Sequence, residues 1–216
     1  MAKSLIFDLD GTLINSLYDI ALSMNKVLEK HNYPVHEIER YNYFVGDGAF
    51  ILVKNALPQN VSEEEITKVL KSFIEIYEQN THNNTKPYEG IYEMLNELEN
   101  MKIKKAVLSN KPHKFTLKYV ENLFNNFQFL EIHGQKTNIP KKPDPSMAIE
   151  IATKLNTLCE EVVFVGDTAT DIKTAKNANM KSIGVAWGFR PVEELKDAGA
   201  DFIAYTPMDI IKYISK

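Results

Sequence analysis

Cysteine, arginine and long apolar runs are all scarce in this chain of 216 residues, and each shortage excludes a class of protein. The single cysteine, Cys159, cannot form an internal disulfide, which is typical of proteins of a reducing compartment. No apolar run approaches the roughly 18–20 residues that a membrane-spanning helix needs. The first residues carry no apolar segment of the signal-peptide type. We therefore expect a cytoplasmic protein that has no membrane partner.

Basic side chains form no extended tract, and the formal net charge is −4 at pH 7. Nucleic acid is therefore not an expected partner. Arginine occurs only as Arg40 and Arg190, against 23 lysines. Since arginine is the preferred bidentate partner of carboxylates and phosphates, a substrate held in that manner has only these two candidates in the chain.

Strand-like and helix-like segments alternate along most of the chain in the order of βαβ units. The pattern predicts strands at residues 5–9, 103–109, 129–133, 162–166, 182–186 and 202–204, and helices at 88–101, 112–124, 145–155, 168–178, 191–198 and 208–214. Residues from about 15 to 82 show helical patterns without a strand, and the polar run 80–85 looks like a linker.

The alternation and its one interruption predict an α/β fold with a Rossmann-like parallel sheet. We expect a core domain of residues 1–14 and 84–216, with an all-helical cap domain of residues 15–83 inserted after the first strand. An insert at that position would hang over the carboxyl end of the sheet, where it can exclude water and select substrates. The apolar residues of the cap suit either a monomer or a homodimer.

The most informative segment is residues 4–13 (SLIFDLDGTL), where an apolar strand runs into Asp8 and Asp10 before Gly11 breaks it. Two carboxylates at the end of a buried strand repel each other unless a cation lies between them or one carries a proton. Ligands bind at this edge of α/β sheets. An ordinary acidic turn is the alternative interpretation of this segment alone.

Further polar groups follow two other expected strands or precede a helix. Ser109 and Asn110 close one strand, Asp167 closes another and is followed by Asp171, and Lys142 stands just before a helix. Taken singly, they could be a strand-end turn, a helix N-cap and a surface charge. Because the carboxyl ends of parallel strands meet at one edge, we expect these groups to converge on the aspartate pair.

This set contains the groups that phosphoryl transfer needs. The carboxylates of Asp8 and Asp167 are hard oxygen ligands suited to Mg²⁺. The hydroxyl of Ser109 and the ammonium of Lys142 would hold the phosphoryl oxygens and offset their charge. One carboxylate can be the nucleophile, forming an aspartyl-phosphate, and Asp10 can act first as general acid and then as general base.

The motifs resemble those of the haloacid dehalogenase superfamily, over the whole chain. Residues 8–13 match the first motif in its phosphatase form, Ser109 the second, Lys142 the third, and residues 166–167 with Asp171 the fourth. Dehalogenase members lack the second aspartate of the first motif, so Asp10 disfavours dehalogenation.

The resemblance implies a role for each matching residue. Asp8 would be the nucleophile and Asp10 the acid and base, and Asp171 would support the metal or orient Lys142. Mg²⁺ would be bound by the Asp8 carboxylate, the Asp10 backbone carbonyl and Asp167. The residues implied in catalysis or in binding the phosphate, besides the two aspartates, are Gly11, Thr12, Ser109, Asn110 and Lys142.

Finer patterns at residues 45–49, 109–112 and 187–189 are similar to those of phosphoglycolate phosphatases. They imply a small phosphorylated metabolite, such as 2-phosphoglycolate, as the substrate. A phosphotransferase of the β-phosphoglucomutase type, a pyrophosphatase or nucleotidase, and a non-catalytic binding protein remain alternatives. A second anionic end of the substrate would need donors, for which Lys111, Arg190, Arg40 and the amides of residues 46–48 are the candidates.

Overall fold

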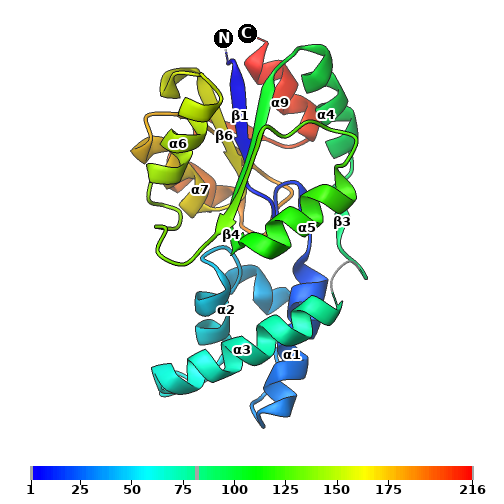
Figure 1. Ribbon diagram of the computed structural model, residues 1–216, viewed down its shortest axis with the longest axis vertical. Coiled ribbons are helices and arrows are strands. Elements are labelled where there is room, and N and C mark those ends of the chain that lie inside the picture. Colours follow the sequence, from blue (N-terminus) through cyan, green and yellow to red (C-terminus); the bar gives the residue numbers. More distant parts are fainter. Residues whose placement is uncertain (1, 81–82, 216) are drawn as a thin grey trace.

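A six-stranded parallel sheet forms the centre of the computed structural model, which describes residues 2–80 and 83–215 (Figure 1). The strand order is β5-β4-β1-β6-β7-β8. The first strand therefore lies in the interior of the sheet, and the chain winds outward from it in both directions. The bounds are β1 Ser4–Phe7, β4 Lys104–Pro112, β5 Glu131–Gln135, β6 Val162–Gly166, β7 Lys181–Val185 and β8 Phe202–Ala204.

Helices cover both faces of the sheet because successive strand residues point to opposite sides. In β1, Leu5 and Phe7 belong to one buried cluster, whereas Ile6 belongs to the other. The first cluster includes residues of α4 (Ile91–Asn100), α5 (His113–Leu123) and α9 (Pro207–Ile214), and the second residues of α6 (Ser146–Lys154) and α7 (Ala169–Asn177). Helix α8 (Val192–Asp197) contacts β7 and α7. The predicted α/β class and the sheet are thereby confirmed.

Residues 17–80, called the helical insert below, lie beyond the carboxyl ends of the strands, at the bottom of Figure 1. Their elements are α1 Leu17–Lys30, the 3₁₀ helix Ile38–Tyr43, α2 Ala49–Ala56 and α3 Glu63–Asn80. Ser62 precedes α3, and its hydroxyl accepts a hydrogen bond from the Glu65 amide at 3.3 Å, as expected for an N-cap.

The two connections to the helical insert pair with each other, which the sequence did not predict. Strand β2 (Ile14–Asn15) is antiparallel to β3 (Lys86–Pro87). Each has only two residues, so neither could show a periodic pattern, and the expectation of helix alone was wrong at residue 15. Residues 81–82 of the expected linker lie outside the described residues. No helix in the described part of the chain is both long and apolar enough to cross a membrane.

Candidate active site

The segment after β1 is held against the end of β6. The Asp8 amide donates to the Val165 carbonyl at 2.9 Å, which extends the strand pairing by one residue. The chain then turns sharply, with the amides of Leu13 and Ile14 donating to the Leu9 carbonyl at 3.0 and 3.1 Å. Strand β1 therefore ends two residues earlier than predicted, with Asp8 directly after it and Asp10 in the turn.

Gly11 is required in this turn for two reasons. Its φ of +83° lies in the left-handed region, where side chains are strained. A Cβ at this position would also overlap the carboxylate of Asp167. Gly11 thus allows the backbone of the turn to pass directly beside the acid that follows β6.

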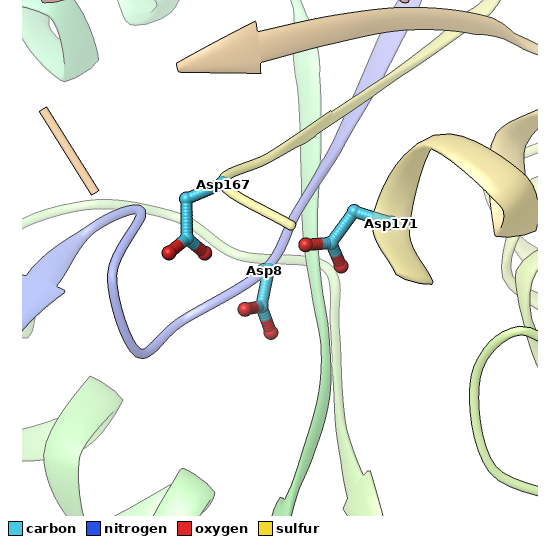
Figure 2. Close-up of side chains that lie close together, drawn as sticks. All are labelled: Asp8, Asp167 and Asp171. Atoms are coloured by element: carbon cyan, nitrogen blue, oxygen red, sulfur yellow. The ribbon is translucent and has the colours of Figure 1, made fainter. Parts of the chain in front are cut away.

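Three buried carboxylates converge at the strand ends (Figure 2). They belong to Asp8 after β1, Asp167 after β6 and Asp171 in the first turn of α7, and one oxygen from each lies within 4.8 Å of the others. Lys142 lies among them, with its Nζ 2.8 Å from Asp8 Oδ1 and 2.6 Å from Asp171 Oδ1. The structure therefore brings together four residues that the sequence placed in one site.

Burial is the largest influence on the pKa of the two carboxyl groups Asp8 and Asp167. It raises the pKa of Asp8 from 3.8 to about 6, although Lys142 opposes the shift. Burial, with the charges of Asp171 and Asp8, raises the pKa of Asp167 well above its usual range. The pKa of Lys142 is also raised, because the attraction of Asp171 and Asp8 outweighs the effect of burial.

The charges of the cluster suit an oxygen-liganded divalent cation. In the described part of the chain, Lys142 is the only basic side chain that forms an ion pair with any of the three carboxylates, and it pairs with Asp8 and Asp171. Asp167 accepts only neutral hydrogen bonds there, from the Thr12 hydroxyl at 3.3 Å and the Phe189 amide at 2.8 Å. One ammonium cannot balance three ionised carboxylates, and hard cations such as Mg²⁺ prefer such ligands. The residues therefore fit the expected metal.

Asp171 serves both a helix cap and the lysine. Its Oδ2 accepts hydrogen bonds from the Thr168 amide at 3.1 Å and the Thr168 hydroxyl at 2.8 Å, which forms a capping box at the start of α7. Its Oδ1 accepts from Lys142 at 2.6 Å. The Asp171 carboxylate therefore both caps α7 and holds Lys142.

Asn110 holds the loop that carries Lys142. Its Oδ1 accepts from the Lys142 amide at 2.9 Å, and its Nδ2 donates to the Lys142 carbonyl at 3.2 Å and the Gly46 carbonyl at 3.0 Å. The side chain expected to bind phosphate thus contacts backbone groups, and it joins the sheet to the helical insert. Ser109 lies beside it, and its Oγ accepts from the Lys111 amide at 3.3 Å. Both residues belong to β4, which runs three residues further than predicted.

A pocket lies between the strand ends and the helical insert. The core side contributes the polar residues Asp8, Asp10, Ser109, Asn110 and Lys111, with Pro112 and Phe115 beside them. The insert contributes mainly apolar side chains and a glycine-rich turn: Ile20, Val45, Gly46, Gly48, Ala49, Leu52, Phe73 and Tyr77. The pocket therefore offers a polar floor and an apolar roof, with the nucleophile candidate Asp8 at its surface.

Residues 5–185 match the sequence model of the family described as haloacid dehalogenase-like hydrolase. The chain belongs to this family. A phosphoglycolate phosphatase of Vibrio parahaemolyticus is 30% identical, over 99% of this chain and 96% of the relative. One from Vibrio cholerae is 32% identical, over 94% and 92%. The solved structure of a predicted phosphoglycolate phosphatase from Haemophilus somnus is 28% identical and superimposes with a TM-score of 0.91, covering 98% of this chain and 97% of that one.

Several contacts in this member of the family were not predicted from the sequence. Asp10 accepts hydrogen bonds from the Ser16 hydroxyl at 2.5 Å and from Lys111 Nζ, which lies 3.1 Å from both of its oxygens. Tyr77 of the helical insert contacts the same Nζ at 2.8 Å. Ser16 and Tyr77 carried no signal in the sequence, because their importance depends on which buried charge the fold places beside them.

The two arginines lie outside the set of described residues that line the pocket. Arg40 is exposed and lies over the Phe44 ring at 5.9 Å. Arg190 pairs with Glu194 at 3.3 Å, and its Nη2 donates to the Val45 carbonyl at 3.1 Å. Arg190 therefore ties the helical insert to the sheet, and neither arginine lines the pocket within the described residues.

Proposed function

We propose that this phosphatase hydrolyses a small phosphomonoester in a Mg²⁺-dependent reaction that proceeds through an aspartyl-phosphate at Asp8, with 2-phosphoglycolate as the first candidate substrate. The observation that carries the proposal is the placement of Asp8. Its carboxylate lies at the surface of the pocket and is paired with Lys142, within a cluster of carboxylates suited to a divalent cation. The names of the relatives support the substrate.

The first step is attack by an Asp8 oxygen on phosphorus. A bond forms between them as the bond from phosphorus to the ester oxygen breaks, and Asp10 donates a proton to the leaving oxygen. Lys142 would stabilise the carboxylate as an anion, and Ser109, which lines the pocket, would donate to a phosphoryl oxygen.

The second step returns Asp8 to its starting form. Asp10 accepts a proton from water, whose oxygen attacks the phosphorus of the aspartyl-phosphate and releases inorganic phosphate. Mg²⁺ bound by Asp8, Asp167 and the Asp10 carbonyl would offset the negative charge of the phosphoryl group. Three further residues would act by positioning these groups. Gly11 and Thr12 lie against Asp167, and Asn110 holds the loop that carries Lys142.

We further propose that residues 15–83 act as a cap over a core of residues 1–14 and 84–216. The roof of the pocket comes from this segment, and it is joined to the core by hydrogen bonds near the glycine-rich turn. Lys141 adds one of them, donating to the Asp47 carbonyl at 2.6 Å. A roof of this kind limits the size of the substrate and the access of water. The proposed location is the cytoplasm, in keeping with the single free cysteine.

The test is phosphate release from a panel of substrates, with Mg²⁺ and with EDTA. The panel contains 2-phosphoglycolate, pyrophosphate, nucleoside monophosphates and sugar phosphates, and Asp8→Asn is the matched control. We expect release only with Mg²⁺, strongest for 2-phosphoglycolate, and none from the variant. Release by Asp8→Asn at the wild-type rate would refute the nucleophile. An isomerised sugar phosphate without phosphate release would instead establish a mutase.

A further inference from the structure

Lys111 is a buried lysine to which the proposed reaction assigns no role. Its side chain is 3% exposed, and it reaches from the end of β4 into the pocket. The ammonium lies 3.1 Å from both oxygens of Asp10 and 2.8 Å from the Tyr77 hydroxyl. It also lies 4.8 Å from the centres of the Tyr77 and Tyr119 rings. These contacts hold a cation at one point beside the general acid candidate.

Lys111 is also the only cationic side chain among the described residues that line the pocket. Lys142 contacts Asp8 from the protein interior, Arg40 is exposed, and Arg190 is engaged by Glu194 and the Val45 carbonyl. Among the described residues that line the pocket, Lys111 is therefore the charged donor that a second anionic group of a substrate would meet, with the backbone amides near Gly46 and Gly48 as neutral donors.

The pairing with Asp10 conflicts with catalysis by Asp10. To protonate an ester oxygen, Asp10 must turn at least one carboxylate oxygen away from Lys111 and toward the substrate. A buried ammonium that loses its anionic partner is strongly destabilised. The Tyr77 hydroxyl and the rings of Tyr77 and Tyr119 are neutral, so they cannot replace the negative charge of Asp10. A negatively charged group on the substrate could.

We propose that Lys111 is a specificity residue that exchanges Asp10 for a second anionic group of the substrate, namely a carboxylate close to the phosphate ester. Binding of the carboxylate and release of Asp10 toward the leaving oxygen are then one event. This inference rests on the proposed function and adds to it the substrate class and the residue that selects it.

The geometry also limits where the carboxylate can be. Asp10 lies one hydrogen bond from Lys111 and must come within one hydrogen bond of the ester oxygen. The substrate carboxylate binds Lys111 by a third hydrogen bond, so it must lie within about three hydrogen-bond lengths, roughly 9 Å, of that oxygen. A carboxylate separated from the ester oxygen by one carbon satisfies this limit, whereas an anion farther away than that does not.

The decisive experiment compares two substrates of the same frame. Ethyl phosphate carries a methyl group where 2-phosphoglycolate carries its carboxylate. We would measure kcat/KM for both with the wild type and with Lys111→Met, which keeps the length of the side chain but not the charge. Loss of a charge-assisted contact should lower the value for 2-phosphoglycolate about 10- to 100-fold more than it lowers the value for ethyl phosphate.

The ratio of kcat/KM for 2-phosphoglycolate to kcat/KM for ethyl phosphate tests the role of Lys111. The inference requires that the wild type prefer 2-phosphoglycolate and that Lys111→Met lower this preference at least about tenfold. A smaller change, as when both substrates lose activity equally, would mean that Lys111 serves Asp10 alone, and it overturns the assignment. Lys114→Met is the matched control, because Lys114 is exposed and pairs with Glu78 across the same contact with α3, and it should leave the ratio unchanged.

Binding provides an arm that does not need turnover. In the Asp8→Asn background, calorimetry with Mg²⁺ measures the affinities of 2-phosphoglycolate and ethyl phosphate, with and without Lys111→Met. We expect the preference for 2-phosphoglycolate to disappear with the lysine, and an unchanged preference would refute the inference. If the wild type hydrolyses neither compound, the proposed function fails and the binding arm alone decides. If Lys111→Met does not fold, Lys111→Gln, whose amide can still donate to Tyr77, is held to the same criterion.

Discussion

Lys142 is the residue whose removal should affect both stability and activity most. It is buried, and its two ion pairs, at 2.8 Å to Asp8 and 2.6 Å to Asp171, are its contacts with the acidic cluster. Lys142→Met keeps the volume but leaves Asp8, Asp167 and Asp171 without a basic partner among the described residues. Breaking a buried ion pair in this manner costs about 3–5 kcal/mol. For a chain of this size that is a fall in Tm of roughly 6–20 °C.

The stability lost in Lys142→Met should depend on pH, and the carboxyl groups of the cluster determine whether the loss grows or shrinks as the pH rises. Asp8 already has a pKa of about 6 in the folded protein, against 3.8 unperturbed, and Lys142 is the main influence that lowers it. Without Lys142 the folded pKa rises further. A carboxyl group whose pKa is higher when folded loses stability as the pH rises from the unfolded value through the folded one. The deficit of Lys142→Met should therefore be larger near pH 8 than near pH 5.

The assay is urea unfolding followed by circular dichroism, in EDTA, at about pH 5 and about pH 8. Lys105→Met is the matched control, because Lys105 is equally buried but pairs with Glu99, at 2.8 Å, away from the cluster. Lys105 and the Gln128 amide hold the pKa of Glu99 below its usual range. The Lys105→Met control should therefore lose a similar free energy of unfolding at about pH 5 and at about pH 8. A loss below about 1 kcal/mol for Lys142→Met, or one that does not grow with pH, would refute the reasoning.

Three further predictions concern the aspartates and the metal. Asp8→Asn should abolish phosphate release. Its midpoint of urea unfolding should equal or exceed that of the wild type, because the substitution removes one charge from the buried cluster. A large loss of stability would contradict this. Asp10→Asn should slow release of phosphate from the aspartyl-phosphate, so acid-quenched protein should retain labelled phosphate; full steady-state activity would count against it. Mg²⁺ should raise Tm more near pH 8 than near pH 5, because the cation displaces protons from Asp8 and Asp167, and equal shifts would indicate a different site.

Local sequence patterns were enough to predict the sheet and the residues that gather at its edge. Strands that are apolar throughout, such as residues 162–166, are typical of parallel strands buried on both faces, and that signal is local. Once the sheet is parallel, the polar residues that follow its strands must gather at one edge. Asp8, Asp167 and the Lys142 loop could therefore be placed together without coordinates. Capping residues such as Ser62 likewise act within one turn of their helix.

Which charged side chains contact each other depends on the packing of the elements and could not be predicted from the sequence. Asp10 and Lys111 meet because β1 and β4 pair in a register that sets Phe7 beside Val107, and a shift by one residue would turn the lysine away. Tyr77 reaches the same ammonium only because α3 lies over the strand ends. Contacts of this kind depend on register and on the angle between packed elements, which no local pattern of residue types encodes.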